Sequence, residues 1–180
     1  MSARPPPPGH PDHRDWLLVE AGDTAHAEGV LAALCDIFAT RAGRAMLRAL
    51  YASGRAARIA RPAPTSPPNA SARPADLAAA TAAGRPTGQT APDGAPLLGT
   101  GAGSDSLIAF DAADWPNPTA PQWASADALL FALLAEAARQ VQGAAEPLGF
   151  VEAAAAEAAG EALAHYLAER GLPPITRPPP

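Results

Sequence analysis

The chain has 180 residues, which is room for one domain, and most of its 48% hydrophobic residues are alanine. With 22 prolines, 15 glycines and only 5% aromatic residues, the composition predicts a small helical core with long unstructured segments. A net charge of −5 with no lysine argues against nucleic-acid binding, and the longest apolar run, Ala128–Ala135, is too short to cross a bilayer. Cys35 is the single cysteine, which excludes an internal disulfide and a cysteine zinc site. Residues 1–11 contain prolines where a signal peptide would have an apolar stretch, so no secretory signal is expected.

The first 14 residues contain Pro5–Pro8 and are expected to form a disordered lead-in. We expect one domain over residues 15–172, beginning with an edge strand at Trp16–Val19. A helix should follow, with Thr24 as its N-cap. Its buried face is expected to carry the apolar residues at helical spacing, namely Val30, Leu31, Leu34, Ile37 and Phe38.

A second helix is predicted from Thr40, and Gly54 suits the C′ position that ends it. Its apolar side consists of Met46, Leu47, Leu50 and Tyr51. A short strand is expected at Ala57–Ala60. From 61 to 103 proline, alanine, threonine, serine and glycine dominate without an apolar period, which predicts a disordered insertion.

Order is expected to return with a strand at Ser106–Phe110, followed by a loop over Asp111–Gln122. Ser125 should cap the strongest helix, Ala126–Gln142, which Gly143 closes. The buried side of that helix is predicted to consist of Leu129, Leu130, Phe131, Leu133, Leu134 and Val141.

The last helix is expected from Phe150 to Arg170, with Gly171 as its cap. Prolines then make residues 173–180 a disordered tail. The predicted fold is therefore mainly α with a few short strands, an α+β arrangement with long Pro/Ala-rich disordered segments.

Four groups of residues occur in the order and spacing of one known family: Leu34, Ile37, Thr40, Gly43, Arg44, Leu47 and Leu50; Gly101–Ser104 with Leu107–Asp111; Ala128–Phe131 with Ala137–Gly143; and Tyr166–Pro173. In this order they resemble the NleD-like zinc metallopeptidases, a family of bacterial effector proteins. The resemblance runs from about Trp16 to Arg177, apart from the proline-rich insertion. It implies a zincin-like remnant of the family's fold.

In that family the active-site helix carries HExxH, in which two histidines one turn apart bind zinc and the glutamate acts as general base. The resemblance places these three positions at Ala132, Leu133 and Glu136. Both histidine ligands and the base are therefore replaced, and Glu136 alone cannot make a metal site. The family's acidic residues in the last helix fall near Ala155 and Ala156.

The remaining histidines offer little support for a metal site. His10 and His13 lie in the proline-rich lead-in and are expected to be solvated. Glu157, Glu161 and His165 share one helix face at i, i+4 and i+8, which is compatible with metal binding. A solvated face with a favourable Glu–His pair is the simpler interpretation.

Other chemistries have weak signals. Cys35 is expected to be a buried small hydrophobe rather than a nucleophile. Gly99–Gly103 lacks the Lys-Ser/Thr of a phosphate-binding loop and precedes a strand. Trp115 and Trp123 are expected to cap the core. A locally basic segment is interpreted as a solvated face, with an acidic partner as the alternative; it contains Arg41, Arg44, Arg48, Arg55, Arg58 and Arg61.

The sequence favours a catalytically inactive metallopeptidase-like protein, a pseudoenzyme that needs no cofactor and acts by binding a protein or peptide. One alternative is an active zinc enzyme whose site has moved to Glu157, Glu161 and His165, with Glu136 as a further ligand. Another is an alanine-rich helical interaction module whose proline-rich arms dock into aromatic-lined grooves. The expected location is the cytoplasm, or the exterior after export without a signal peptide.

Overall fold

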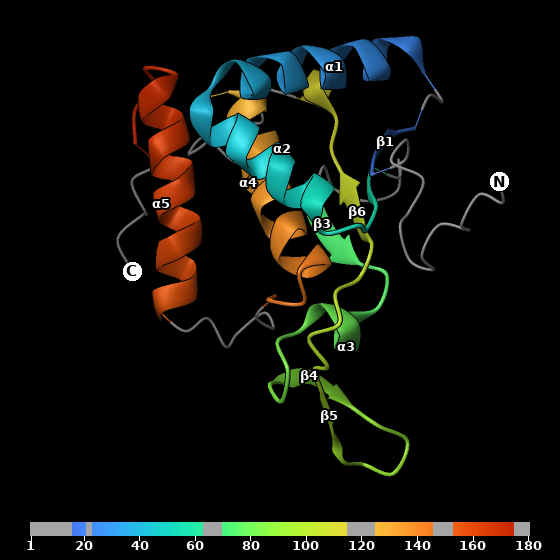
Figure 1. Cartoon of the computed structure of the whole chain (residues 1–180). Coiled ribbons are helices and arrows are strands. Elements are labelled where there is room, and N and C mark those ends of the chain that lie inside the picture. Colours follow the sequence, from blue (N-terminus) through green and yellow to red (C-terminus); the bar gives the residue numbers. More distant parts are fainter. Residues whose placement is uncertain (1–15, 21–22, 63–69, 115–124, 146–152, 175–180) are drawn as a thin grey trace, which may run out of the picture.

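The fold is taken from a computed structural model that describes residues 16–20, 23–62, 70–114, 125–145 and 153–174, with only the backbone described over 153–159 (Figure 1). The expectations for the lead-in, for His10 and His13, for Trp115 and Trp123, and for residues 175–180 of the tail lie outside these residues. The described part mixes helices with short strands, which confirms the coarse α+β expectation.

A four-stranded sheet holds the order β1-β2-β6-β3. Its strands are β1 (Leu17–Val19), β2 (Ala57–Ala60), β6 (Ser106–Ala109) and β3 (Ser71–Pro74). The first three are parallel, and β3 runs antiparallel to β6 at the far edge. Ile59 and Ile108 are direct neighbours in this register and are fully buried. The strands predicted near residues 16–19, 57–60 and 106–110 are thus confirmed, with β1 at an edge.

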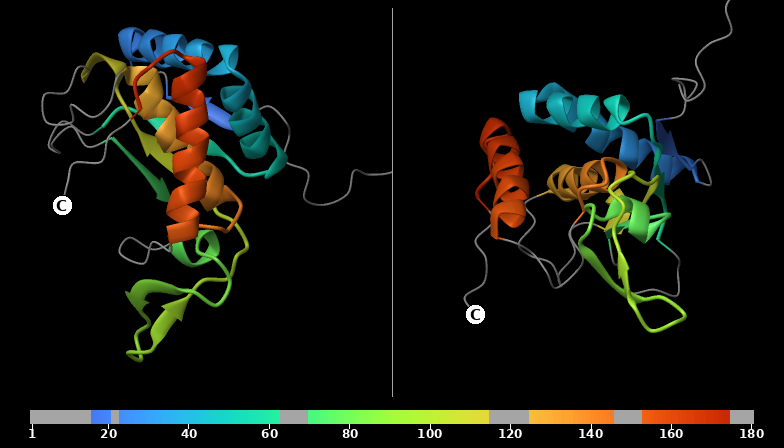
Figure 2. Two further views of the ribbon diagram at one scale, coloured as in Figure 1. Left: turned by 90° about the vertical axis from the view of Figure 1, so that its left-hand side faces the viewer. Right: turned by 60° about the horizontal axis from the view of Figure 1, so that its bottom comes forward.

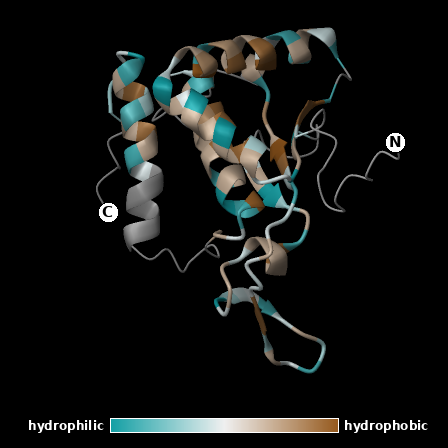
Figure 3. Cartoon of the chain, in the orientation of Figure 1, coloured by the Kyte–Doolittle hydropathy of each residue, from teal (hydrophilic) through white to brown (hydrophobic). Residues whose placement is uncertain are grey.

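Helix α1 (Thr24–Ala39) differs from its predicted orientation. Asp23, not Thr24, is the N-cap, and its side chain accepts the Ala25 N–H. Leu31 and Phe38 are 54% and 61% exposed, although Figure 3 shows strongly hydrophobic residues along this helix. The buried face instead follows His26, Val30, Ala33 and Ile37. Successive side chains of a helix are about 100° apart around its axis. The apolar residues of α1 are therefore spread over two neighbouring faces, and the sequence did not indicate which of the two is buried.

Helix α2 (Arg41–Ala52) begins and ends as predicted. Thr40 is its N-cap and accepts the Gly43 N–H at 2.8 Å. Gly54 adopts a φ of 68° just beyond the end of the helix, where glycine avoids the strain that a Cβ would bring. Leu50 is buried, but Tyr51 remains 45% exposed, so the apolar side of this helix is only partly covered.

Helix α4 (Ala126–Val141) is the centre of the molecule. Ser125 caps it and Gly143 follows it with a φ of 67°, both as predicted. It packs against β3 and β6, and α1, α2 and α5 (Ala153–Glu169) surround it (Figure 2). This placement explains why α4 is buried on almost every side. Of its predicted core residues, all except the half-buried Leu129 are buried.

Residues 70–103 contain secondary structure where the sequence predicts disorder. Besides β3 they form α3 (Leu77–Ala80) and a hairpin of β4 (Pro86–Thr90) and β5 (Pro96–Leu98) that projects from the body (Figure 1). Backbone hydrogen bonds of distant partners hold this segment, such as Ala145 N–H to the Ala80 carbonyl at 2.9 Å. Local hydrophobic patterns do not reveal such bonds, which is why the prediction was wrong for these residues.

A short 3₁₀ turn, η1 (Ala112–Asp114), follows β6, and Gly171 ends α5 with a φ of 66°. The predicted start of the last helix at Phe150 lies outside the described residues. The largest fully buried side chains include Tyr166, Phe110, Phe131, Leu130 and Leu134. In the described part of the chain, no helix combines the length and the hydrophobicity needed to span a bilayer.

Candidate functional site

The three positions that the resemblance aligns with HExxH lie in the middle of α4. Leu133 is 9% exposed and belongs to the hydrophobic core, and Ala132 is half-buried. Glu136 accepts a hydrogen bond from Gln140 Nε2 at 3.2 Å and lies 3.8 Å from Arg139 Nη1. Burial raises the pKa of the Glu136 carboxyl above its usual value, although the Arg139 charge and the Gln140 bond oppose this. Glu136 therefore serves as an acceptor within its own helix.

The alternative metal ligands do not gather in the part that the structure describes. Glu161 and His165 are exposed on α5, and the Glu157 side chain lies outside that part. No three His, Cys, Asp or Glu side chains among the described residues could hold a metal ion together.

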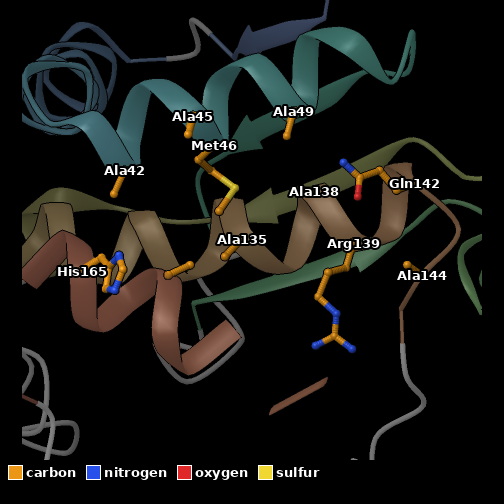
Figure 4. Close-up of a pocket in the computed structure, with 11 residues that line it drawn as sticks. Ala42, Ala45, Met46, Ala49, Ala135, Ala138, Arg139, Gln142, Ala144 and His165 are labelled. Atoms are coloured by element: carbon orange, nitrogen blue, oxygen red, sulfur yellow. The ribbon is translucent and has the colours of Figure 1, made fainter. Parts of the chain in front are cut away.

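An open pocket of about 590 Å³ lies between α2, α4 and α5 (Figure 4). Alanine side chains form most of its wall, because α2, α4 and α5 each present small residues there. Its lining consists of Ala42, Ala45, Met46, Ala49, Ala135, Ala138, Arg139, Gln142, Ala144, Ala162 and His165. None of the three HExxH positions lines it. The pocket opens on a face of α4 next to the one that holds these three positions.

Arg139 is the cation of this apolar pocket. Its Nη2 atom is buried and has no hydrogen-bond partner within the described residues. Its other terminal nitrogen, Nη1, is 3.8 Å from Glu136, a long ion pair. An unpaired buried donor is costly, by about 1–3 kcal/mol or more for a charged group. The pocket therefore combines an apolar wall with the Arg139 side chain, which is 22% exposed.

A buried polar cluster holds α5 beside the pocket. The Tyr166 hydroxyl donates to the Asp127 carboxylate, and Arg170 Nε donates to the same oxygen at 3.1 Å. Arg170 Nη2 also lies 3.1 Å from Asp36 of α1. Burial would raise the pKa of Asp127, but bonds from Ser125 and Tyr166 and the Arg170 charge outweigh it and hold that pKa below its usual value.

Tyr166 is a hydrogen-bond donor in this cluster. Burial, together with the hydrogen bond and the charge of Asp127, raises the pKa of the Tyr166 phenol far above its usual value. Its ring stacks on Phe131 with a centroid distance of 4.3 Å. The phenol thus stays protonated and acts as a fixed donor, which suits a structural role.

A second buried cluster lies at the carboxyl ends of the parallel strands. His26 of α1 is 3% exposed, and its Nδ1 atom lies 3.7 Å from Asp111, just after β6. Neither ring nitrogen of His26 has a hydrogen-bond partner in the described part. Arg61, just after β2, binds Asp111 at 2.7 Å and Asp23 at 2.9 Å.

Burial favours a raised pKa for Asp111, but the Ala113 N–H bond and the Arg61 charge outweigh it and leave that pKa below its usual value. The ionised Asp111 thereby connects the ends of two strands with α1. Because these contacts join α1 to the ends of β2 and β6, we interpret the cluster as structural.

The structure also tests two further sequence hypotheses. Cys35 is exposed, contrary to its predicted burial, because α1 is rotated. The amides of Gly101 and Gly103 donate to the carbonyls of Thr81 and Ala79, so the glycine-rich loop packs against the chain instead of presenting free N–H groups. A Cβ on Gly103 would lie 2.2 Å from the Val141 carbonyl oxygen, which explains why glycine is needed there.

The basic segment divides into three parts, one of which is Arg55, whose Nη2 donates to the Ala102 carbonyl at 3.2 Å. Arg58 and Arg61 pair with Glu20, Asp23 and Asp111 near the carboxyl ends of the strands. The arginines of α2 form no ion pair with a described residue; they are Arg41, Arg44 and Arg48.

No protein-family model, no curated protein and no solved structure matches the chain. The resemblance to the NleD-like metallopeptidases therefore remains a prediction.

Sequence reasoning missed the polar residues on which both buried clusters depend. Asp127 was visible only as an acidic residue in the first turn of a helix, and Tyr166 only as part of a terminal motif. His26 and Asp111 are separated by 85 positions. A single sequence without contact information offers no signal for these pairs.

Proposed function

We propose that this chain is a non-catalytic binding protein, a metallopeptidase-like pseudoenzyme that binds a peptide or a protein segment in the pocket between α2, α4 and α5. The single observation that carries the proposal is an open apolar pocket of about 590 Å³ whose wall includes the guanidinium of Arg139, which among the described residues has only a long ion pair of 3.8 Å to Glu136. The replacement of the HExxH residues by Ala132, Leu133 and Glu136 supports the loss of catalysis.

The lining defines the chemistry of the ligand. Alanine walls on three helices allow a close approach of an apolar side chain, and Met46 can adjust its shape to it. A carbonyl or carboxylate oxygen of the same ligand would pair with the exposed part of the Arg139 side chain. The proposed ligand is therefore a segment with a large apolar side chain next to an acceptor, as in a helix-in-groove or extended-peptide complex.

The test is a selection from a random-peptide display library on the intact chain, followed by calorimetry of the selected peptides. Ala49→Leu fills the pocket from α2, and Arg139→Met removes the donor but keeps an aliphatic stem. Ala32→Leu is the matched control, since Ala32 is exposed on α1 and does not line the pocket.

We expect Ala49→Leu to weaken peptide binding by at least about tenfold, or about 1.4 kcal/mol, and Ala32→Leu to leave it unchanged. Arg139→Met should weaken it by several-fold. Ala49→Leu should also retain the stability of the parent chain, because the added side chain enters empty space. Peptides that bind all three variants equally, or a strong loss of stability in Ala49→Leu, would contradict the proposal.

A further inference from the structure

A second concave surface lies on the other side of α2, where α1 and α2 meet the edge strand β1. This aromatic hollow has a volume of about 290 Å³ and is lined by Trp16, Phe38, Arg44, Leu47, Arg48 and Tyr51. Trp16 and Tyr51 meet edge to face with a centroid distance of 5.9 Å and an interplanar angle of 84°. This contact fixes two of the aromatic walls relative to each other.

The hollow is unusually apolar for an exposed surface. Phe38 is 61% exposed and Tyr51 is 45% exposed, although the chain has few aromatic residues. Large apolar side chains that gather on a concave surface are typical of a binding site rather than of a solvated face.

The two arginines at the hollow, Arg44 and Arg48, differ from Arg58 and Arg61 of the basic segment in having no carboxylate partner among the described residues. Arg58 and Arg61 are neutralised by carboxylates. Arg44 instead donates through Nη1 to the carbonyls of Phe38 and Ala39, both at 3.0 Å, which fixes its position without neutralising its charge. Arg48 is exposed, and no carboxylate of the described residues pairs with it. The hollow is therefore a local cationic site on a chain of net charge −5.

We propose that the aromatic hollow binds an acidic peptide segment of a partner protein, with one large apolar side chain inserted between the aromatic rings and adjacent carboxylates paired with Arg44 and Arg48. The charge complementarity selects an acidic partner, because an acidic chain repels such a segment everywhere except near uncompensated cations. The volume sets the size of the insert at one or two side chains. This site is independent of the pocket between α2, α4 and α5.

An anionic membrane is the competing partner for a surface of aromatic residues and arginines. A concave site favours a single inserted side chain, whereas a membrane favours a convex or flat surface with many cations. The net charge of −5 also opposes approach to an anionic bilayer. The peptide is therefore the partner that the geometry favours.

The experiment uses the full chain and two labelled peptide libraries of about nine residues with the same randomised apolar centre. One library carries Asp and Glu on both sides of the centre, and the other carries Lys at those positions. Binding is measured by fluorescence polarisation, and vesicles with phosphatidylserine are tested in parallel by sedimentation.

Two pairs of variants locate the site. Arg48→Glu reverses the charge at the hollow, and Arg73→Glu makes the same change on the exposed face of β3, at the opposite edge of the sheet. Phe38→Ser removes an aromatic wall, and Leu98→Ser removes a 49% exposed side chain from the projecting hairpin.

We expect the acidic library to bind the parent chain. Arg48→Glu and Phe38→Ser should each weaken this binding by roughly tenfold, and the two control variants should change it by less than about twofold. The affinity of the acidic library should fall as salt increases. Equal binding of the lysine library, equal effects of Arg48→Glu and Arg73→Glu, or no binding of the acidic library would overturn the proposal. Vesicle binding that depends on Phe38 and Arg48 in place of peptide binding would also overturn it.

Discussion

Removal of the Tyr166 hydroxyl is predicted to loosen the attachment of α5 to the rest of the fold. Tyr166 is fully buried, and its hydroxyl donates a hydrogen bond to the carboxylate of Asp127. The same carboxylate also accepts a hydrogen bond from Arg170 Nε. Tyr166→Phe keeps the ring that stacks on Phe131 and deletes only the bond from the hydroxyl. The change therefore isolates the polar link between α4 and α5.

The structure sets the size of the effect. A hydrogen bond to a charged group contributes about 1.5–3 kcal/mol, so Tyr166→Phe should lower the free energy of unfolding by about 2 kcal/mol. Asp127→Ala leaves the phenol and Arg170 without their shared acceptor, and breaking a buried pair costs about 3–5 kcal/mol. For Asp127→Ala we expect the low end of this range, because the Arg170 side chain is 28% exposed and retains its ion pair with Asp36.

The assay is equilibrium urea unfolding of the two single variants and the double variant, followed by circular dichroism. The double variant should lose less than the sum of the single losses, since both changes remove the same bond. Asp36→Ala is the control: its carboxylate is 50% exposed, so its loss should cost less than about 1 kcal/mol. The reasoning is refuted if Tyr166→Phe has no measurable effect, or if Asp36→Ala costs as much as Asp127→Ala.

Three further predictions concern charge and packing. Burial raises the pKa of Glu136 above its ordinary value of 4.5, so its ionisation opposes folding at neutral pH. Glu136→Gln should therefore stabilise the chain at pH 7 by less than about 1 kcal/mol, because the side chain is 40% exposed. This gain in the free energy of unfolding should vanish below pH 4.5. Glu161→Gln is the control, because Glu161 is exposed, and we expect no gain from it. The pKa of Asp127 is lowered from 3.8, so its contribution to stability is present above pH 3.8 and is lost as the pH falls further. Below pH 3.8 the free energy of unfolding should therefore fall more steeply with pH in the parent chain than in Asp127→Asn. A Cβ on Gly43 would lie 1.8 Å from the Ile37 carbonyl oxygen, whereas one on Gly160 meets nothing within 4 Å. Thermal unfolding should show Gly43→Ala destabilised by about 1–3 kcal/mol and Gly160→Ala stabilised by about 0.5–1 kcal/mol; similar values for the two would contradict the packing.

The elements that could be predicted from sequence are those with local signals. Caps and C′ glycines fixed the ends of α2 and α4, as Thr40, Gly54, Ser125 and Gly143 show. The β-branched residues of the central strands marked β2 and β6. In α1 the apolar residues were recognised, but the rotation of the helix was not, because only its contacts with α2, α4 and η1 select Ala33 over Leu31 for burial.

The segment over residues 70–103 could not be predicted, since its structure depends on partners far along the chain. Strand β3 pairs with β6, more than thirty residues later, and Gln140 of α4 donates to the Ala72 carbonyl at 3.1 Å. The candidate site shows the same limit. The alanines of α2, α4 and α5 were visible as composition, but their convergence on one pocket with Arg139 follows only from the helix arrangement.

The central claim is that this chain binds a partner and has no catalytic zinc site. Calorimetric titration of the full, metal-stripped chain with Zn²⁺ tests it most directly. We predict no stoichiometric binding, because no three His, Cys, Asp or Glu side chains among the described residues could hold a metal ion together. The resemblance also places Ala132, Leu133 and Glu136 where the family carries the three residues of HExxH. One zinc ion bound per chain with submicromolar affinity, and lost in His165→Ala, would contradict the claim and favour a relocated site on α5.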